Sequence, residues 1–296
     1  MDFFASWYPG DLWVPDYDPN CRMLISTSSV SQYWRLDRYK NLPITLIIDS
    51  GGFRYASRPD KRLFPQEVLT KQISMIRGQD LKIFLCALDH PIFDPALSSN
   101  EKDRRISQTI AYAYEMKAQF EKLSLDSNIQ PMAIVQGYDV ASLKFCAHEL
   151  KSIGFSWYGL GSLLAVKQNE SALIQRVEAV IDQVGTNLHI FGISSISTIR
   201  KLRQLGVTSF DSARPAKSAM YNQIFFYIRN QLTVFESHGD SNLHIPVPPE
   251  MRDFPCNCPI CNGQFNYLVT IIGKRHNIAL RAIHNYWHLK MAFLDQ

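Results

Sequence analysis

The chain has 296 residues, of which 46% are hydrophobic and 20% are charged. This composition excludes a disordered or fibrous protein, because the apolar residues suffice to bury a core. The formal net charge of +4 permits contact with a polyanion but does not require it. The sequence has no charge-free apolar run of about 18 residues and no basic stretch at its start, so we expect a cytoplasmic protein with no membrane association.

Short β-rich runs alternate with longer amphipathic segments over most of the chain. The candidate strands are residues 23–26, 44–48, 83–88, 132–135, 157–160, 188–193 and 207–210. The amphipathic segments between them are residues 65–77, 104–123, 140–153, 170–184 and 195–205. Such alternation predicts parallel strands joined by helices, and this many units favours a (β/α)8 TIM barrel over a doubly wound sheet. Residues 243–247 are the candidate for the eighth strand.

Polar or glycine-rich turns follow nearly every candidate strand. The turns are Asp49-Ser50-Gly51-Gly52, Asp89-His90-Pro91, Gln136-Gly137, Gly161-Ser162, Gly192-Ile193-Ser194 and Asp211-Ser212. Active sites of (β/α)8 barrels are assembled at the carboxyl ends of the strands, so three aspartates in such turns favour one shared pocket. The alternative is that each aspartate caps the helix that follows it.

The pattern changes after Asp211. Residues 221–235 are apolar and aromatic and predict one long helix, whereas residues 237–255 are rich in proline and polar residues and predict a loop. From residue 265 to the end the pattern is helical and basic. We therefore predict a catalytic barrel in residues 1–236, followed by a metal-binding subdomain and C-terminal helix in residues 237–296.

Three cysteines lie within six residues, as Cys256-Asn257-Cys258-Pro259-Ile260-Cys261. In a reducing compartment, cysteines this close together more often bind metal than form disulfides. Zinc prefers four ligands in a tetrahedron, so one histidine is needed. The candidates are His276, His284 and His288, which would lie roughly on one face of a helix. Such a closed Cys3His site is expected to be structural.

These motifs together resemble the tRNA-guanine transglycosylases and their relatives that act on DNA. The matching residues are Asp49-Ser50-Gly51-Gly52-Phe53, Leu88-Asp89, Ile134-Val135-Gln136-Gly137, Gly159-Leu160-Gly161-Ser162-Leu163, Phe191-Gly192-Ile193, Phe210-Asp211, the cysteine cluster and Ile283-His284-Asn285. They come in the family's order. The resemblance implies a zinc-containing (β/α)8 barrel with one structural Zn²⁺ per chain, and it selects His284 as the fourth ligand beside Cys256, Cys258 and Cys261.

The resemblance also implies an activity: exchange of a guanine in a polynucleotide for a free 7-deazaguanine, such as the 7-cyano form. By position in its motif, Asp211 is then the nucleophile and Asp49 the general acid/base, with Asp89 reading the guanine edge. The other substrate-binding candidates are Gln136 for the carbonyl edge, Ser50, Gly51, Gly161, Ser162 and Leu163 along the pocket, and Phe53 and Phe191 as a sandwich for the base. For each phenylalanine the alternative is a place in the barrel core.

Several residues depart from the pattern of the tRNA enzymes. The departures are Arg54 after Gly-Gly-Phe, Ser162 and Leu164 in the glycine-rich turn, Asp89-His90-Pro91, and residues 213–217 after the nucleophile. We therefore favour DNA as the polynucleotide, with tRNA as the alternative and a non-catalytic partner subunit disfavoured because all three aspartates are present. Homodimerisation or a helper protein is left open.

Basic residues near these motifs are candidates for phosphate contacts. Arg54, Arg214 and Lys217 follow the catalytic aspartates on the same loops. Lys274, Arg275 and Arg281 near the cysteine cluster are further candidates, with an exposed helix face as the alternative explanation.

Overall fold

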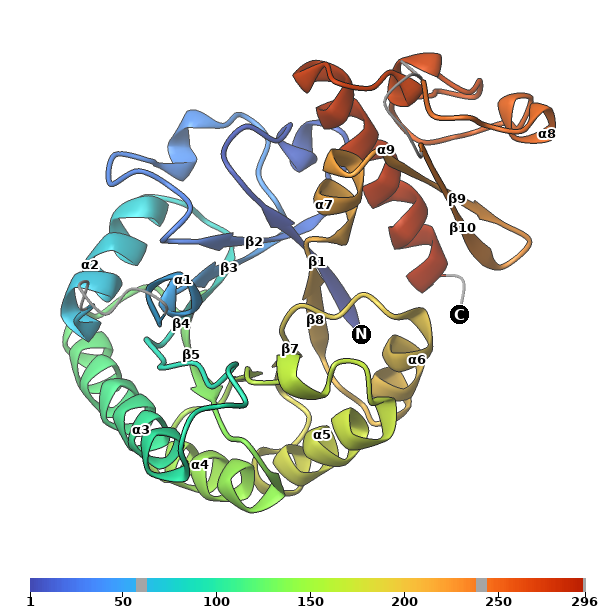
Figure 1. Ribbon diagram of the computed structural model, residues 1–296. Coiled ribbons are helices and arrows are strands. Elements are labelled where there is room, and N and C mark those ends of the chain that lie inside the picture. The colour runs from blue at the N-terminus through green and yellow to red at the C-terminus, as the bar shows by residue number, and fades with distance from the viewer. Residues whose placement is uncertain (57–62, 238–243, 295–296) are drawn as a thin grey trace.

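The computed structural model describes residues 1–56, 63–237 and 244–294, and its centre is a closed barrel of eight parallel strands (Figure 1). The strands are β1 (Asp2–Trp7), β2 (Arg22–Ser26), β3 (Thr45–Asp49), β4 (Lys82–Cys86), β5 (Ile129–Val135), β6 (Tyr158–Leu160), β7 (Leu188–Ile190) and β8 (Ser209–Ser212). Each strand pairs with its neighbours in chain order, and β1 closes the barrel by pairing with both β2 and β8. The predicted (β/α)8 fold is confirmed.

All seven candidate strands are present, but the prediction of the eighth was wrong. The missing strand is β1 at the N-terminus, where the sequence Asp-Phe-Phe-Ala-Ser-Trp has no β-branched residue to mark it. Of the candidate residues 243–247, Leu243 lies outside the described residues, and His244 forms only an isolated antiparallel bridge with Ile271. β1 is held in place by pairing with β8, the last strand, when the barrel closes. A pairing between the two ends of the barrel leaves no local signal in the sequence of residues 2–7.

Helices cover the outside of the barrel, as Figure 1 shows. They are α1 (Gly52–Ala56), α2 (Pro65–Ile76), α3 (Ser99–Lys122), α4 (Val140–Ser152), α5 (Glu170–Val184), α6 (Ile196–Gln204) and α7 (Arg214–Met220). The N-caps of α3 to α6 are Ser98, Asp139, Asn169 and Ser195, each accepting from a backbone N–H in the first turn. Asp89 and Asp211 therefore cap none of these helices.

Residues 221–235 form a β-hairpin, which corrects the prediction of a long helix. The hairpin consists of β9 (Gln223–Ile228) and β10 (Gln231–Glu236), paired antiparallel. Arg229 and Asn230 have positive φ angles of 49° and 62°, the conformation that a tight two-residue hairpin turn requires. Side chains of β9 alternate, with Phe225 in the barrel core and Ile224 and Phe226 in a second cluster around the cysteines. Because both faces are apolar, the sequence shows no alternation.

The C-terminal part packs on one side of the barrel. The short α8 (Pro249–Arg252) and a 3-10 turn, η4 (Tyr267–Thr270), precede the long α9 (Arg275–Leu294). The helix predicted from residue 265 therefore begins ten residues later. Phe293 of α9 contacts Phe3 and Phe210 of the barrel through edge-on ring contacts. The predicted boundary between a catalytic barrel in residues 1–236 and a metal-binding subdomain in residues 237–296 stays a prediction. No helix in the described ranges is long and apolar enough to cross a membrane.

Candidate active site and metal centre

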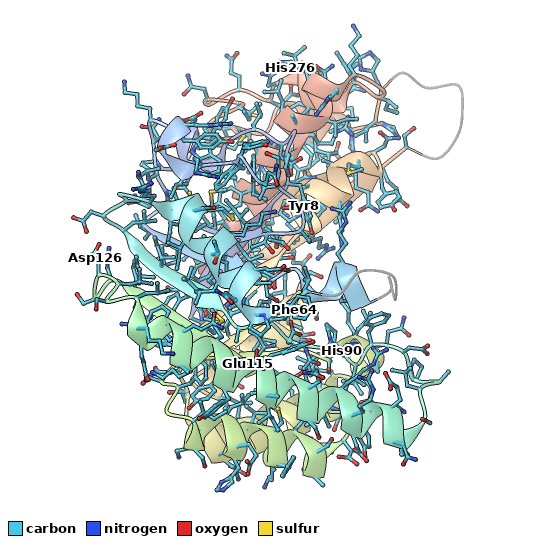
Figure 2. The ribbon with its side chains drawn as sticks, turned by 90° about the vertical axis from the view of Figure 1, so that its left-hand side faces the viewer. Tyr8, Phe64, His90, Glu115, Asp126 and His276 are labelled. Atoms are coloured by element: carbon cyan, nitrogen blue, oxygen red, sulfur yellow. The ribbon has the colours of Figure 1, made fainter. Side chains whose placement is uncertain are left out.

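The three strand-terminal aspartates lie at the same end of the barrel. Asp49 is the last residue of β3, Asp89 follows β4, and Asp211 is in β8. Figure 2 shows His90, the residue after Asp89, at the opposite end of the barrel from Asp126, which precedes β5. This end is therefore the carboxyl end of the strands, where barrel enzymes place their chemistry.

Asp211 is 6% exposed and is held by three groups, which come from β1, β7 and the loop after β7. Ser6 Oγ of β1 donates to Oδ2 at 2.6 Å, and the backbone N–H of Gly192 donates to Oδ1 at 2.8 Å. His189 Nε2 lies 3.3 Å from the same Oδ1. These contacts fix the orientation of the carboxylate, as a nucleophile in the barrel mouth requires.

Ser6 and His189 are site residues that the sequence interpretation missed. His189 is fully buried between Asp211 and Ser209, whose Oγ lies 2.9 Å from Nδ1. One tautomer satisfies both contacts, with Ser209 donating to Nδ1 and the Nε2–H donating to Asp211. A polar residue inside the apolar run Leu188-His189-Ile190 was the available signal for His189. Ser6 had no such signal because its strand was not recognised.

Asp49 is positioned by its own turn. Its Oδ2 accepts the backbone N–H of Gly51 at 3.1 Å, where the chain turns with a φ of 86° that favours glycine. Burial raises the pKa of the Asp49 carboxyl, and the charge of Asp211 acts in the same direction. A raised pKa suits a group that must both give and take a proton near neutral pH.

Asp89 belongs to a hydrogen-bonded network at the ends of β4, β5 and β6. Gln136 Nε2 donates to Asp89 Oδ2 at 2.6 Å, and Ser50 Oγ donates to Oδ1 at 3.2 Å. On its other side, Gln136 Oε1 accepts from Ser162 Oγ. Burial, followed by the charge of Asp49, raises the pKa of Asp89 to about 7. The carboxyl group therefore titrates in the physiological range, which is common at functional sites.

Two glycines allow this network to close. A Cβ atom at Gly52 would lie 2.6 Å from Asp89 Oδ1, and one at Gly161 would lie 2.4 Å from Gln136 Nε2. Both approaches are too close for any other residue without displacement of the network. The next residue, Ser162, has a positive φ of 57°, a conformation that is uncommon for non-glycine residues.

The remaining predicted base-binding residues lie around this network. Phe53 is 59% exposed and its ring lies 5.1 Å from that of Phe93, while the Phe191 ring packs edge-on against His189. Leu163 is buried. The roles assigned to these residues, and to Ser50, Gly51, Gly161 and Ser162, stay predictions.

The basic candidates differ in their surroundings. Arg54 and Lys217 are exposed at the barrel mouth and on α7, whereas Arg214 is half-buried and donates to the carbonyl of Ser194. The prediction for Arg281 was wrong. Its guanidinium is fully buried and donates to the carbonyls of residues 219, 269 and 271. These hydrogen bonds hold α9 against α7 and η4, so the guanidinium is not available to a phosphate.

The predicted metal ligands lie together in the C-terminal part. Cys256, Cys258, Cys261 and His284 are buried, and their ligand atoms all lie within 4.8 Å of one another. His284 Nδ1 faces the three sulfur atoms, and Nε2 donates to the carbonyl of Phe225 at 2.8 Å. A metal-binding histidine usually donates its second N–H in this way, because the bond fixes the tautomer and the ring orientation. The donor set and the spacing fit a tetrahedral zinc ion.

The other two histidines are now distinguished. His276 is exposed at the start of α9 (Figure 2), about 12 Å along the helix from His284 at 1.5 Å per residue. His288 accepts the backbone N–H of Tyr227 at Nδ1, and its Nε2 lies 3.2 Å from Cys256 Sγ. His288 therefore donates to the sulfur of a candidate ligand and lies outside the group of four residues that could hold a metal ion.

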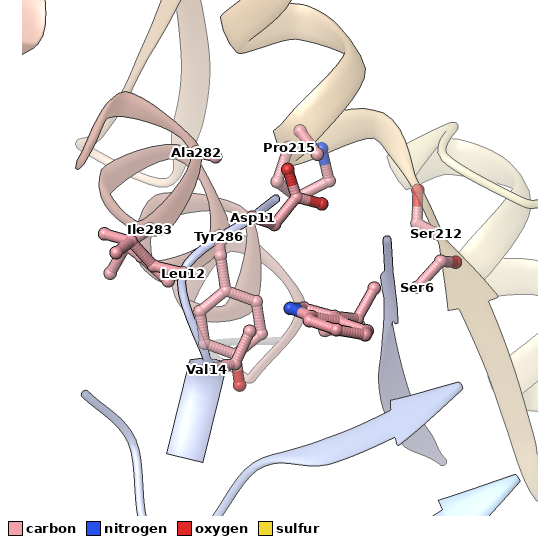
Figure 3. A pocket seen from close by; sticks show the side chains of 12 residues that line it. Ser6, Asp11, Leu12, Val14, Ser212, Pro215, Ala282, Ile283 and Tyr286 are labelled. Atoms are coloured by element: carbon pink, nitrogen blue, oxygen red, sulfur yellow. The ribbon is translucent and has the colours of Figure 1, made fainter. Parts of the chain in front are cut away.

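A small apolar pocket lies beside Ser6, between the barrel and the helices α7 and α9 (Figure 3). It is lined by residues such as Leu12, Val14, Pro215 and Tyr286. Its volume of about 30 Å³ has room for little more than one water molecule. This gap is too small for a purine base.

Comparisons with known proteins agree with this geometry. Residues 25–295 match the family model described as queuine tRNA-ribosyltransferase. The chain is 24% identical to the tRNA-guanine(15) transglycosylase of Korarchaeum cryptofilum, over 82% of this chain and 38% of that protein. It is 25% identical to the queuine tRNA-ribosyltransferase of Methylacidiphilum infernorum, over 67% of this chain and 58% of that protein. The chain thus spans less than two thirds of the length of these relatives. It belongs to the queuine tRNA-ribosyltransferase family.

Proposed function

We propose that this protein exchanges a guanine in a polynucleotide for a free 7-deazaguanine through a covalent glycosyl-aspartate intermediate. The observation that carries the proposal is the convergence of three carboxylates at the barrel mouth, in which Asp211 is oriented by Ser6, His189 and the Gly192 N–H. Nucleophile, acid/base and base-reading group are then three separate residues at the carboxyl ends of three strands.

In the first half of the reaction, a carboxylate oxygen of Asp211 attacks C1′ of the target nucleotide. The bond from C1′ to the guanine nitrogen breaks, its electron pair leaves with the base, and protonated Asp49 supplies the proton. The product is an ester between the sugar and Asp211, analogous to the intermediate of retaining glycosidases. The raised pKa of Asp49 supports the acid role, because the group must be protonated at this step.

In the second half, Asp49 accepts the proton from the ring nitrogen of the incoming 7-deazaguanine, which attacks C1′ and releases Asp211. The sugar-phosphate chain is never cut. Asp89, as a carboxylate, accepts from the N1–H and the 2-amino group of the base, and Gln136 holds Asp89 and contacts the carbonyl edge. One Zn²⁺ held by Cys256, Cys258, Cys261 and His284 would stabilise the C-terminal part without entering the reaction.

We further propose DNA as the polynucleotide. In support of this, the departures from the tRNA enzymes gather where a polynucleotide would lie, at Arg54, His90 and residues 213–217. A tRNA guanine is the second candidate, because the relatives compared above are named as enzymes of tRNA.

The test is guanine exchange by the purified protein. Radiolabelled guanine is incubated with duplex DNA, single-stranded DNA and bulk tRNA, and incorporation of label is followed with each polymer. Labelling of DNA supports the full proposal, and labelling of tRNA alone would reassign the substrate. Labelling of single-stranded but not duplex DNA would indicate a helper that opens the duplex. Absence of label in every polymer, with the protein folded and metal-loaded, would overturn the proposed reaction.

A further inference from the structure

A second hollow, larger than the pocket beside Ser6, is lined by residues close in sequence to the proposed nucleophile and to Gly192. It has a volume of about 180 Å³ and lies between α5, α6 and the loops after β7 and β8. Its lining includes Ile193 and Ser194, which directly follow the Gly192 whose N–H donates to Asp211. Arg214, three residues after Asp211, also lines the hollow and donates to the Ser194 carbonyl at 3.0 Å. The hollow is therefore attached to both loops that hold the nucleophile.

Two cations face this hollow without a carboxylate partner in the described ranges. Arg214 packs over the Phe225 ring at 5.1 Å, and its one hydrogen bond leaves most of its five N–H donors unused. Burial lowers the pKa of Arg214, the sign of a cation in an environment that does not stabilise its charge. Lys167 lines the exposed rim and forms no ion pair among the residues that the structure describes.

Glu170, the acidic side chain that contacts Thr198 of the lining, is already engaged. Glu170 accepts from Ser197 and Thr198 and forms an ion pair with Lys201 on α6. Its charge is thus compensated by Lys201, while the charges of Arg214 and Lys167 are left for a ligand. Ser194 and Ser195 also line the hollow, together with Leu173 and with Thr198, whose hydroxyl already donates to Glu170. A half-buried arginine fork, a lysine and hydroxyls are the groups that bind a phosphate.

We propose that this hollow is a subsite for one phosphate group, namely a phosphate of the target nucleotide itself. The proposal rests on the proposed function, because the sugar attacked by Asp211 carries its phosphates within a few ångströms of C1′. Loops after the seventh and eighth strands are a frequent phosphate site in (β/α)8 barrels. Binding at this subsite would fix the sugar relative to Asp211, and it differs from backbone contacts made by exposed lysines such as Lys217.

The test measures binding, so that it does not depend on catalysis. Short single-stranded oligonucleotides with one guanine, in DNA and RNA versions, receive a neutral methylphosphonate at one linkage at a time. Binding is measured by fluorescence anisotropy. In the wild-type protein, replacing the phosphate at one linkage beside the guanine should lower the binding affinity most. The expected loss is about 10- to 100-fold, which is the range of a charge-assisted hydrogen bond. In Lys167→Ala, the sensitivity at that linkage should largely disappear while the other linkages behave as before.

Lys144→Ala is the matched control, because Lys144 is an exposed cation outside the hollow that already has a partner, Asp182 of α5. It should keep the wild-type pattern. Arg214→Lys should reduce the same position-specific effect as Lys167→Ala, which guards against a folding defect in either variant. Equal sensitivity of all linkages in the wild-type protein, or an unchanged pattern in Lys167→Ala, would overturn the subsite. Failure of guanine exchange with an intact binding pattern would count against the proposed reaction alone.

Discussion

The barrel mouth and the cysteine centre both bring together side chains that repel one another when they are ionised, but they differ in what surrounds those side chains. At the mouth, three carboxylates from three strands are surrounded by neutral donors such as Ser6, Ser50 and Gln136. No lysine or arginine pairs with them within the part of the chain that the structure describes. In the cysteine centre, three thiols and one histidine lie within 4.8 Å of one another. Both centres collect groups whose ionised forms repel, so each needs a positive partner or a proton.

The difference lies in what completes each centre. The four ligand atoms of the cysteine centre converge on one point, and a single divalent cation satisfies all of them. The carboxylates are held apart by their strands, so no single ion replaces the proton that Asp89 retains up to a pH of about 7. The first arrangement suits a closed, structural metal site, whereas the second suits carboxylates that react with a substrate, as proposed above.

Replacement of the proposed nucleophile should have the largest effect. Asp211→Asn keeps the size of the side chain but removes the attacking carboxylate, so exchange should fall by at least about 10³-fold. The covalent protein–polynucleotide adduct, detected on a denaturing gel after rapid quenching, should disappear. Asp49→Asn should slow turnover and still form some adduct. Asp94→Asn, an exposed aspartate in the loop after β4, is the control. A persistent adduct in Asp211→Asn would assign the nucleophile elsewhere.

Loss of a metal ligand should damage stability before chemistry. His284→Ala removes the fourth ligand and the bond to the Phe225 carbonyl. Structural zinc contributes on the order of 10 kcal/mol to the folding of small zinc domains, so the C-terminal part should become sensitive to protease. Metal content by mass spectrometry should fall from about one zinc per chain toward zero. His276→Ala, which changes an exposed histidine of the same helix, should keep its metal. Full zinc content in His284→Ala would contradict the ligand assignment.

The sequence predicted most of the barrel because its strands are marked by short apolar runs and its helices by periodicity. The strand that it missed, β1, carries Ser6, and the location of β1 depends on closure with β8. The hairpin was mistaken for a helix because Ile224, Phe225 and Phe226 are buried on both faces. A two-sided apolar strand has no period from which it could be distinguished.

The sequence predicted which carboxylates lie together in the candidate site, but it did not predict the side chains that hydrogen-bond to them. Asp49, Asp89 and Asp211 follow apolar runs, and such positions can be read from the sequence. His189 lies inside β7, where only side-chain direction shows that it faces Asp211. The burial of Arg281 could not be predicted, because the carbonyl groups that it binds come from segments up to 62 residues away. Hydrogen bonds between such distant segments leave no mark in the sequence.

Support of the metal centre by His288 should give an intermediate effect. His288→Phe removes the donor to Cys256 Sγ while retaining an aromatic ring against Phe226. Loss of such a supporting hydrogen bond typically weakens metal binding about 10- to 100-fold. Competition with a chromophoric chelator should show this loss, and one zinc per chain should still bind at saturation. A stoichiometry near zero would instead make His288 a ligand, and unchanged affinity would remove it from the site.

The smallest expected effect is the pH dependence of base binding, which tests the proton held at the mouth. In the proposed reaction Asp89 must be ionised to accept from the base, and its pKa of about 7 lies above the usual range because of burial and the charge of Asp49. Affinity for free 7-deazaguanine should therefore rise with pH and level off above 7, with an approximately tenfold loss at one pH unit below the pKa. The hydrogen bond from Gln136 stabilises the carboxylate, so Gln136→Leu should move the midpoint to higher pH as well as weaken binding. Calorimetric titrations between about pH 5.5 and 8 measure both changes. A midpoint that is unmoved in Gln136→Leu would show that another group controls the profile.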